Sequence, residues 1–236
     1  MLGLPAADGV TGAPVLGVDG CPGGWIGALL VGDGVTLRVA PGIEELLAAL
    51  PGAPAVVGID IPIGLPDSGP READRLARRE LPVGRKSSVF PTPARAAVLA
   101  DTWPEANEAN RAATGKGLSH QGFNLCRKIA EVDAWVLAGP GVVVAEVHPE
   151  VSFAVMGADT RPSKQRPEGR DVRRRALRDV GLDLPAELRG PGWAVDDALD
   201  ACAAAWTARR IARGEALSFP DPPEVFSDGI AAAIRA

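Results

Sequence analysis

The stretch "APAVVGIDIPIGLP", residues 53–66, constrains the fold more than any other part of the chain. Its apolar residues run on without the alternation of a half-exposed strand, which is typical of a strand covered on both faces in the middle of a mixed sheet. Pro62 cannot donate to a sheet ladder, so this strand must end near Asp60. A charged side chain at a buried strand end is costly unless it is paired or binds a cation. Asp60 is therefore a candidate functional residue.

Three shorter strands are predicted before this run. They are "APVLGVDG", "GWIGALLV" and "GVTLRVA", and glycine-rich turns separate them. Asp-Gly between apolar runs is a strong hairpin signal, so we expect these strands to be antiparallel in sequence order. "GIEELLAALP" follows with apolar residues at helical spacing, and Pro51 ends that helix.

A helical crossover makes two strands parallel neighbours. If the fourth strand returns beside the first, Asp19 and Asp60 emerge at the same sheet edge, where open α/β sheets place their sites. Three antiparallel strands, a helix and a parallel fourth strand are the order of the RNase H-like fold. Enzymes of that fold cluster carboxylates around divalent metal ions, and a third acidic position is expected on a late helix after a fifth strand.

The rest of the chain supplies that strand and that helix. A fifth strand is predicted at Val142–Val147, and the segment 192–214, "GWAVDDALDACAAAWTARRIARG", is strongly helical and ends at Gly214. Its first turns carry Asp196, Asp197 and Asp200. Residues three apart share a helix face, so Asp197 and Asp200 point together. The alternative is that these acids only complement the helix dipole.

The predicted architecture is one RNase H-like domain over residues 13–236, preceded by a flexible tail, residues 1–12. We expect an α/β fold with a mixed five-stranded sheet, three antiparallel strands and then two parallel ones, flanked by helices. Residues 66–139 lack a strand pattern and are predicted to form a helical insertion between the fourth and fifth strands. Charged helices are expected at "READRLARREL" and at 121–137.

Composition excludes several classes of protein. The chain has 236 residues and a net charge of −5, which argues against indiscriminate coating of nucleic acid. Three scattered cysteines without a Cys-x-x-Cys pair predict neither a disulfide framework nor a zinc site. No run approaches the roughly 20 apolar residues of a membrane helix, and the first residues lack the features of a signal peptide. We therefore expect a cytoplasmic protein with no membrane partner.

Several motifs together resemble one known family. "GVDGCPGGW", "GIDIPIGLP", "KSSVF", "KGLSHQGFNL" with "KIAEVDAW", "EVHPEVSF" and "DDALDA" occur here in that order. The chain resembles the domain of unknown function 429 family from about Val15 to the C-terminus. Members of that family are regarded as predicted nucleases of RNase H-like fold. The last helix is also similar to that of Holliday-junction resolvases, in which two acids three apart precede Ala-Leu.

The resemblance implies a metal-dependent nuclease that hydrolyses the phosphodiester bonds of a nucleic acid. Carboxylates suit Mg2+ or Mn2+, and two such ions can activate a water and stabilise the leaving oxygen. Asp19 would bridge both ions, Asp60 would bind one, and Asp197 or Asp200 the other. Asp196 is a further candidate metal ligand that could substitute for or assist either.

A second polar cluster follows the fifth strand, at Glu146, His148 and Glu150. Glu146 is a candidate catalytic residue as a metal or water ligand, and His148 is a candidate base or substrate contact. The alternatives are a strand-end charge and a structural histidine. Further candidate substrate contacts are Arg85, Lys86, Ser87, Ser88 and Lys116. The basic stretch 161–179 is typical either of a nucleic-acid patch or of an exposed helix.

Two other functions remain open at this point. The first is an ATP-binding phosphotransferase-like protein of the actin or sugar-kinase type, which shares the strand framework but generally needs two lobes. The second is a non-catalytic nucleic-acid-binding module. The sequence does not distinguish DNA from RNA as the substrate, or endonuclease from exonuclease action. It also leaves open whether the protein is catalytically active and what its oligomeric state is.

Overall fold

The computed structural model of the protein describes residues 12–236. The predicted flexible tail, residues 1–12, lies outside the described residues except for Gly12.

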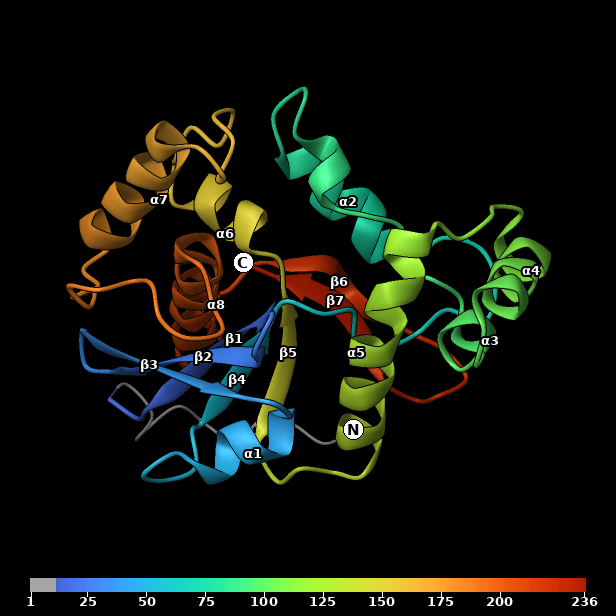
Figure 1. The fold of residues 1–236 in the computed structure, drawn as a ribbon, viewed down its shortest axis with the longest axis horizontal. Coiled ribbons are helices and arrows are strands. Elements are labelled where there is room, and N and C mark those ends of the chain that lie inside the picture. The colour runs from blue at the N-terminus through green and yellow to red at the C-terminus, as the bar shows by residue number, and fades with distance from the viewer. Residues whose placement is uncertain (1–11) are drawn as a thin grey trace.

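Within residues 12–236, seven strands form one mixed sheet in the order β3-β2-β1-β4-β5-β7-β6 (Figure 1). The strands are β1 (Val15–Cys21), β2 (Gly24–Val31), β3 (Gly34–Ala40), β4 (Val56–Ile59), β5 (Val143–Val147), β6 (Ser218–Val225) and β7 (Ala231–Arg235). β1, β2 and β3 pair antiparallel, β4 pairs parallel with β1, and β5 pairs parallel with β4. The α/β class and the arrangement of the first five strands are confirmed.

The predicted number of five strands is wrong, because β6 and β7 extend the sheet beyond β5. β6 contains three prolines, which argue against a strand, yet β6 is the edge strand and needs fewer ladder donors there. β7 has the sequence "AAAIR", whose alanines favour helix by intrinsic propensity. Its pairing with β5 and β6 overrides that local preference.

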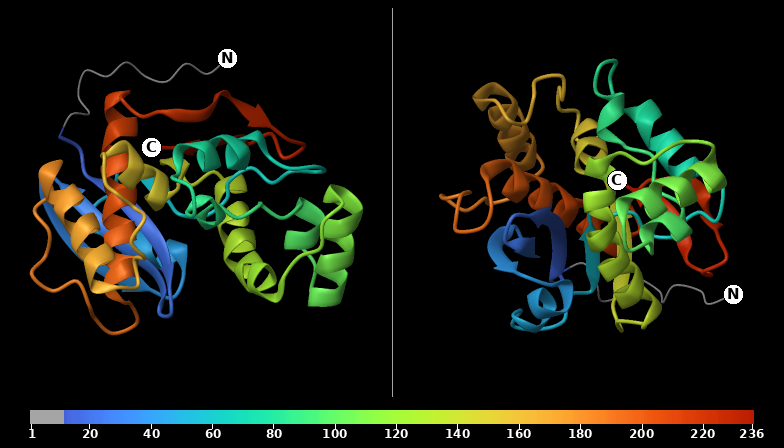
Figure 2. Two further views of the ribbon diagram at one scale, coloured as in Figure 1. Left: turned by 90° about the horizontal axis from the view of Figure 1, so that it is seen from above. Right: turned by 45° about the vertical axis from the view of Figure 1, so that its right-hand side comes forward.

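Eight α-helices surround the sheet in the part of the chain that is described. They are α1 (Ile43–Ala48), α2 (Glu72–Glu80), α3 (Arg95–Val98), α4 (Trp103–Thr114), α5 (His120–Leu137), α6 (Pro149–Val155), α7 (Pro167–Asp179) and α8 (Val195–Arg213), with a 3-10 turn η1 (Lys86–Ser88). α2 to α5 all lie between β4 and β5, and α3 and α4 stand away from the sheet (Figure 2). Over residues 12–236, none of these helices has both the length and the apolar character to cross a membrane.

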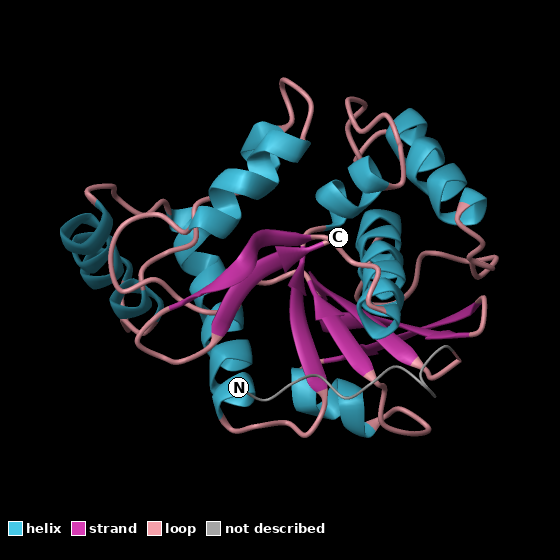
Figure 3. Ribbon diagram, turned by 180° about the vertical axis from the view of Figure 1, so that it is seen from behind, coloured by secondary structure: helices cyan, strands magenta, loops and turns pink. Residues whose placement is uncertain are grey.

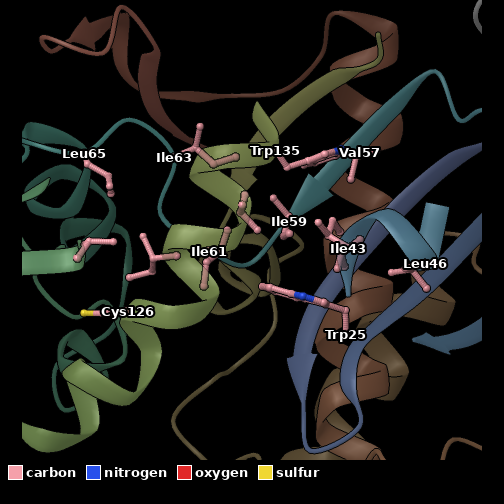
Figure 4. Close-up of a cluster of buried hydrophobic side chains, with 14 of the residues drawn as sticks. Trp25, Ile43, Leu46, Val57, Ile59, Ile61, Ile63, Leu65, Cys126 and Trp135 are labelled. Carbon is pink, nitrogen blue, oxygen red and sulfur yellow. The ribbon is translucent and has the colours of Figure 1, made fainter. Parts of the chain in front are cut away.

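Side chains alternate along the strands into two separate cores, one on each face of the sheet. Helices lie on both faces of the sheet (Figure 3). On one face, Leu16 and Ile59 pack with residues of α1 and α5, and Trp25 lies close to Ile43 in this cluster (Figure 4). On the other face, Val15 and Val56 pack with α6, α7 and α8. The sheet is therefore covered on both sides, as the continuous apolar run at β4 predicts.

α8 approaches the sheet unusually closely at two glycines. A Cβ atom added to Gly17 of β1 would lie 2.0 Å from the amide nitrogen of Ala205 and 2.1 Å from the carbonyl oxygen of Ala201. One added to Gly58 of β4 would lie 2.8 Å from the carbonyl oxygen of Ala204. Small residues on both surfaces thus let the helix backbone lie directly on the two central strands, which sets the position of the acids at the start of α8.

Candidate functional site

Asp19 and Asp60 stand on neighbouring parallel strands. The register pairs Gly17 with Gly58 and Val18 with Ile59, and its next step sets Asp60 beside Asp19. The amide of Asp60 donates to the carbonyl of Val18 at 2.9 Å, which carries the ladder on to this residue. By alternation, both carboxylates share the sheet face of Gly17 and Gly58, which is the face that α8 covers. The predicted meeting of these two acids is present.

α8 brings two further carboxylates to the same place. Asp200 is buried at 1 % exposure, and its charge raises the pKa of Asp19, as does the charge of Asp197. Asp197 has a second role, because its Oδ2 accepts the amide proton of Ala194 at 2.8 Å at the start of the helix. Asp197 is therefore partly engaged as a helix cap.

Burial and mutual repulsion hold these acids toward their neutral forms. Burial, and then the charges of Asp60 and Asp200, raise the pKa of Asp19 well above its ordinary value. Burial raises the pKa of Asp60 to about 7 and that of Asp200 to about 6, while Lys164 works in the opposite direction at both. Because burial and repulsion disfavour the ionised forms of these carboxylates, a nearby positive charge would stabilise those forms.

Lys164 supplies one positive charge from the loop before α7. Its Nζ forms an ion pair with Oδ2 of Asp200. The charge of Asp200, with further contributions from Asp19 and Asp60, raises the pKa of Lys164. The lysine is thus a fixed cation among three carboxylates, and it neutralises only part of their charge.

The second oxygen of Asp200, Oδ1, is buried and has no hydrogen-bond partner among the described residues. A buried acceptor left without a partner is costly, and such atoms commonly mark a place for a ligand or ion. Over residues 12–236, however, no three side chains of His, Cys, Asp or Glu are arranged to hold a metal ion. The oxygen donors suit Mg2+ or Mn2+ by type, but Lys164 occupies one side of Asp200.

Glu146 is engaged elsewhere. Its two oxygens accept from Nη1 and Nη2 of Arg71 at 2.8 and 2.7 Å, and Oε2 also accepts the amide proton of Ile63 at 2.8 Å. The register pairs Glu146 with Ile59, whose side chain lies in the core on the α1 and α5 face. Glu146 thus lies on the opposite face from Asp19, and it acts on Asp60 only by raising its pKa through charge.

Glu150 and His148 also have structural partners. Glu150 accepts from Nη2 of the buried Arg173 at 2.6 and 2.8 Å, and Arg85 approaches it at 3.3 Å. Nε2 of His148 lies 3.2 Å from the carbonyl oxygen of Ser88. Burial lowers the pKa of His148, and its Nδ1 is buried without a partner among the described residues. His148 is therefore a neutral ring close to the acids rather than a second cation.

The remaining predicted positions are spread around this centre. Asp196 lies 3.8 Å from Arg170 of α7, apart from the neighbours that raise the pKa of Asp19. Much of the basic stretch 161–179 is used inside the molecule, because Lys164, Arg170 and Arg173 all pair with carboxylates. The structure thus divides that stretch between internal ion pairs and an exposed helix surface.

Three of the predicted substrate contacts lie together at a cavity. Ser87, Ser88 and Lys116 are among the residues that line a space of about 710 Å3 between α2, η1 and the start of α5. Arg85 pairs with Glu150, and Lys86 is exposed. Two contacts link the cavity wall to the polar residues at the end of β5, because Ser88 also contacts His148 and the cavity residue Arg71 also binds Glu146.

Sequence reasoning missed the cations that hold these acids in place, namely Lys164, Arg71 and Arg173. Lys164 lies in a proline-rich loop, where no periodicity indicates which way a side chain points. Arg71 precedes α2 and is 1 % exposed, although a single arginine in "GPREADR" resembles any helix start. Only the long-range partners of these residues, dozens of positions away, distinguish them from surface charges.

Comparison with known proteins gives one match. The model of a protein family of unknown function, DUF429, matches residues 17–225. A search of curated proteins found no match. A search of solved structures found none either. The matched range spans most of the chain. It contains Asp19, Asp60, Asp197 and Asp200 as well as every residue that lines the cavity. The protein therefore belongs to the DUF429 family.

Proposed function

We propose that this protein is a metal-dependent nuclease of RNase H-like fold, which hydrolyses phosphodiester bonds of a nucleic acid at Asp19, Asp60 and Asp200. The observation that carries the proposal is the convergence of these acids from two parallel strands and one late helix, with the buried Oδ1 of Asp200 unpartnered in the described chain. The strand order β3-β2-β1-β4-β5 supports the assignment of the fold.

The carboxylates would hold the metal, and their oxygens fit Mg2+ or Mn2+. When bound, such an ion polarises the phosphodiester and activates a water molecule. The charges of Asp60 and Asp200 have the largest effect on Asp19 of any charged groups, which supports a central position for it. Asp197 would be an additional metal ligand only through its other oxygen, since Oδ2 already caps α8. Glu146 is left out of this set because Arg71 saturates it.

Lys164 has a defined part in this proposal. In the metal-free protein its ammonium group partly neutralises Asp200, Asp19 and Asp60. A cation held at Asp200 would be repelled by the ammonium group of Lys164, which is paired with Oδ2 of the same carboxylate. The long side chain, 37 % exposed, can then turn toward solvent or toward a phosphate of the substrate.

The test is metal binding followed by cleavage. We expect Mn2+ to bind the wild type in isothermal titration calorimetry and to support cleavage of single-stranded, duplex or branched oligonucleotides. Asp19→Asn should lose both binding and cleavage. Asp196→Asn is the control, because Asp196 lies in the first turn of α8 close to Asp200 but its carboxylate is directed toward Arg170. This variant should retain both Mn2+ binding and cleavage.

Two results would count against the proposal. One is an Asp19→Asn variant that binds Mn2+ and cleaves as the wild type does. The other is metal binding without turnover on any of these substrates, which would favour a non-catalytic binding module. A thermal shift with ATP and Mg2+ in the absence of any shift with nucleic acid would instead favour the phosphotransferase alternative.

A further inference from the structure

We infer that the 710 Å3 cavity between α2, η1 and the start of α5 binds one unstacked nucleotide of a single-stranded segment, next to the carboxylate site. The inference rests on the proposed function, and it names the form of the substrate that this function would act on.

The size and form of the cavity suit one small molecular unit. Its volume falls within the roughly 300–1,000 Å3 that is typical of small-molecule sites. A pocket of this size has room for a base with its sugar and phosphate. A base can enter such a pocket only from a single strand or after it is flipped out of a duplex.

Two cations at the cavity are available for a phosphate. Lys116 and Arg78 line it, and neither takes part in an ion pair within residues 12–236. Arg78 donates through Nε to the carbonyl of Val89 at 2.7 Å, which fixes its guanidinium at the wall. The carboxylate of Asp74 in the lining is already bound by Arg71 at 2.7 Å. The free charge of the cavity is therefore positive, whereas that of the neighbouring acid cluster is negative.

One aromatic ring at the cavity is available for a base. Phe90 is half-buried, lines the cavity, and belongs to none of the three hydrophobic cores of the described residues. Leu118 and Leu125 add further apolar surface to the lining. An aromatic face beside cations is the usual combination at sites that hold single-stranded nucleic acid.

Two residues of the cavity wall contact residues whose charges interact with those of the carboxylate site. Ser88 lines the cavity, and its carbonyl oxygen lies 3.2 Å from His148, whose pKa responds to Asp200 and Lys164. Arg71 lines the cavity and holds Glu146, whose charge acts on Asp60. A nucleotide in the cavity would thus position the strand, with an adjacent phosphodiester directed toward the acids.

Fluorescence anisotropy with a labelled short oligothymidylate in EDTA tests this inference without cleavage. We expect Phe90→Ala to weaken binding roughly tenfold through the lost stacking. Lys116→Met should weaken binding. It should also make the negative slope of log affinity against log salt shallower by about 0.7, the value for one phosphate contact to a single strand. Arg38→Met is the control, since Arg38 is exposed on the distant edge strand β3 and its loss should leave affinity unchanged.

The outcomes separate this inference from the proposed function. Asp60→Asn should bind oligothymidylate at least as well as the wild type, although it loses metal-dependent cleavage. Wild-type affinity in both cavity variants would overturn the inference, and so would a wild type that binds duplex as well as single strand or binds neither. If Phe90→Ala proves unfolded by circular dichroism, the salt slope of Lys116→Met decides.

Discussion

At the scale of single residues, the site is a balance between several buried carboxylates and one ammonium group. Lys164 is the cation whose charge lowers the pKa of Asp19, whereas the charges of three acids raise it. A single flexible lysine is a weak substitute for a divalent ion, because its one charge cannot satisfy all the oxygens. This imbalance leads to two predictions.

The first prediction concerns Lys164→Met. In EDTA the variant should lose about 1–2 kcal/mol of unfolding free energy, a figure discounted because the lysine is partly exposed. Added Mn2+ should restore that loss and raise the melting temperature more than in the wild type, since the lysine no longer competes. Differential scanning fluorimetry with and without Mn2+ measures both effects. Arg161→Met, which removes an exposed pair with Asp159, is the control, and an equal response in it would contradict the prediction.

The second prediction concerns pH. Burial raises the pKa of Asp60 to about 7, so the folded protein binds a proton there that the unfolded chain releases near pH 4. The proton stabilises the fold at low pH, and that stabilisation is lost as pH rises from about 4 to about 7. Because asparagine does not ionise, Asp60→Asn should remove this pH-dependent loss of stability.

Urea unfolding in EDTA should therefore show the Asn variant gaining on the wild type with rising pH, by on the order of 2 kcal/mol above pH 7. Taking the difference between the two proteins removes the contributions of groups that do not interact with Asp60, whereas the titration of Asp19, whose pKa Asp60 raises, changes together with it. A difference that stays constant from pH 4 to pH 8 would show that Asp60 is ionised throughout.

The residues that sequence alone identified are those at the ends of strands and on a helix face. Asp19 and Asp60 follow apolar runs, and Asp200 lies three positions after Asp197, so local periodicity suffices to place them together. Glu146 follows the same rule, but its side chain is bound by Arg71, a residue 75 positions away. Local patterns place a backbone, whereas the partner of a buried charge depends on the assembled fold.

At the scale of elements, the site depends on how closely α8 lies on the sheet. Ala201, Ala204 and Ala205 face glycines of the two central strands, so the helix backbone rests against the strand backbone. This contact sets the height of Asp200 above β1. Sequence reasoning recognised both elements but not their close approach, because a glycine in a strand has the same local pattern whether or not a helix lies on it.

The third prediction is that Gly17→Ala displaces α8. The added methyl group would meet backbone atoms of Ala205 and Ala201 at about 2 Å, which no rotamer change can relieve. Overpacking against backbone should cost about 3 kcal/mol or more, and it should weaken Mn2+ binding as Asp200 moves away. Gly52→Ala is the control because nothing lies within 4 Å of its added Cβ, and its stability should stay within about 0.5 kcal/mol of the wild type. Equal urea midpoints for the two variants would contradict this account.

At the scale of the whole molecule, the first five strands were predictable and the last two were not. Each of the five is a run of apolar or alternating residues between turn signals, and the crossover rule then sets their order. β6 and β7 lack such patterns, since prolines interrupt one and alanines fill the other. They are strands because the open edge beyond β5 offers backbone partners, which is a property of the sheet rather than of the segment.

A buried ion pair helps to join the helices between β4 and β5 to this sheet. Arg71 precedes α2 and binds Glu146 on β5 with two bonds of 2.7 and 2.8 Å, and it also binds Asp74 at 2.7 Å. Both Arg71 and Glu146 are buried, so neither can be solvated if its partner is lost. This ion pair links the cavity wall, through Arg71, to β5, through Glu146.

The fourth prediction is a strong coupling between these two residues. Arg71→Met alone should cost about 3–5 kcal/mol, because it leaves the carboxylate of Glu146 buried without its charge partner. Glu146→Gln alone should cost less, about 1–3 kcal/mol, because Arg71 keeps its ion pair with Asp74. The double variant should lose clearly less than the sum of the two, with a coupling energy of about 1–3 kcal/mol in urea unfolding. If the two losses simply add, the ion pair does not couple the start of α2 to β5 energetically.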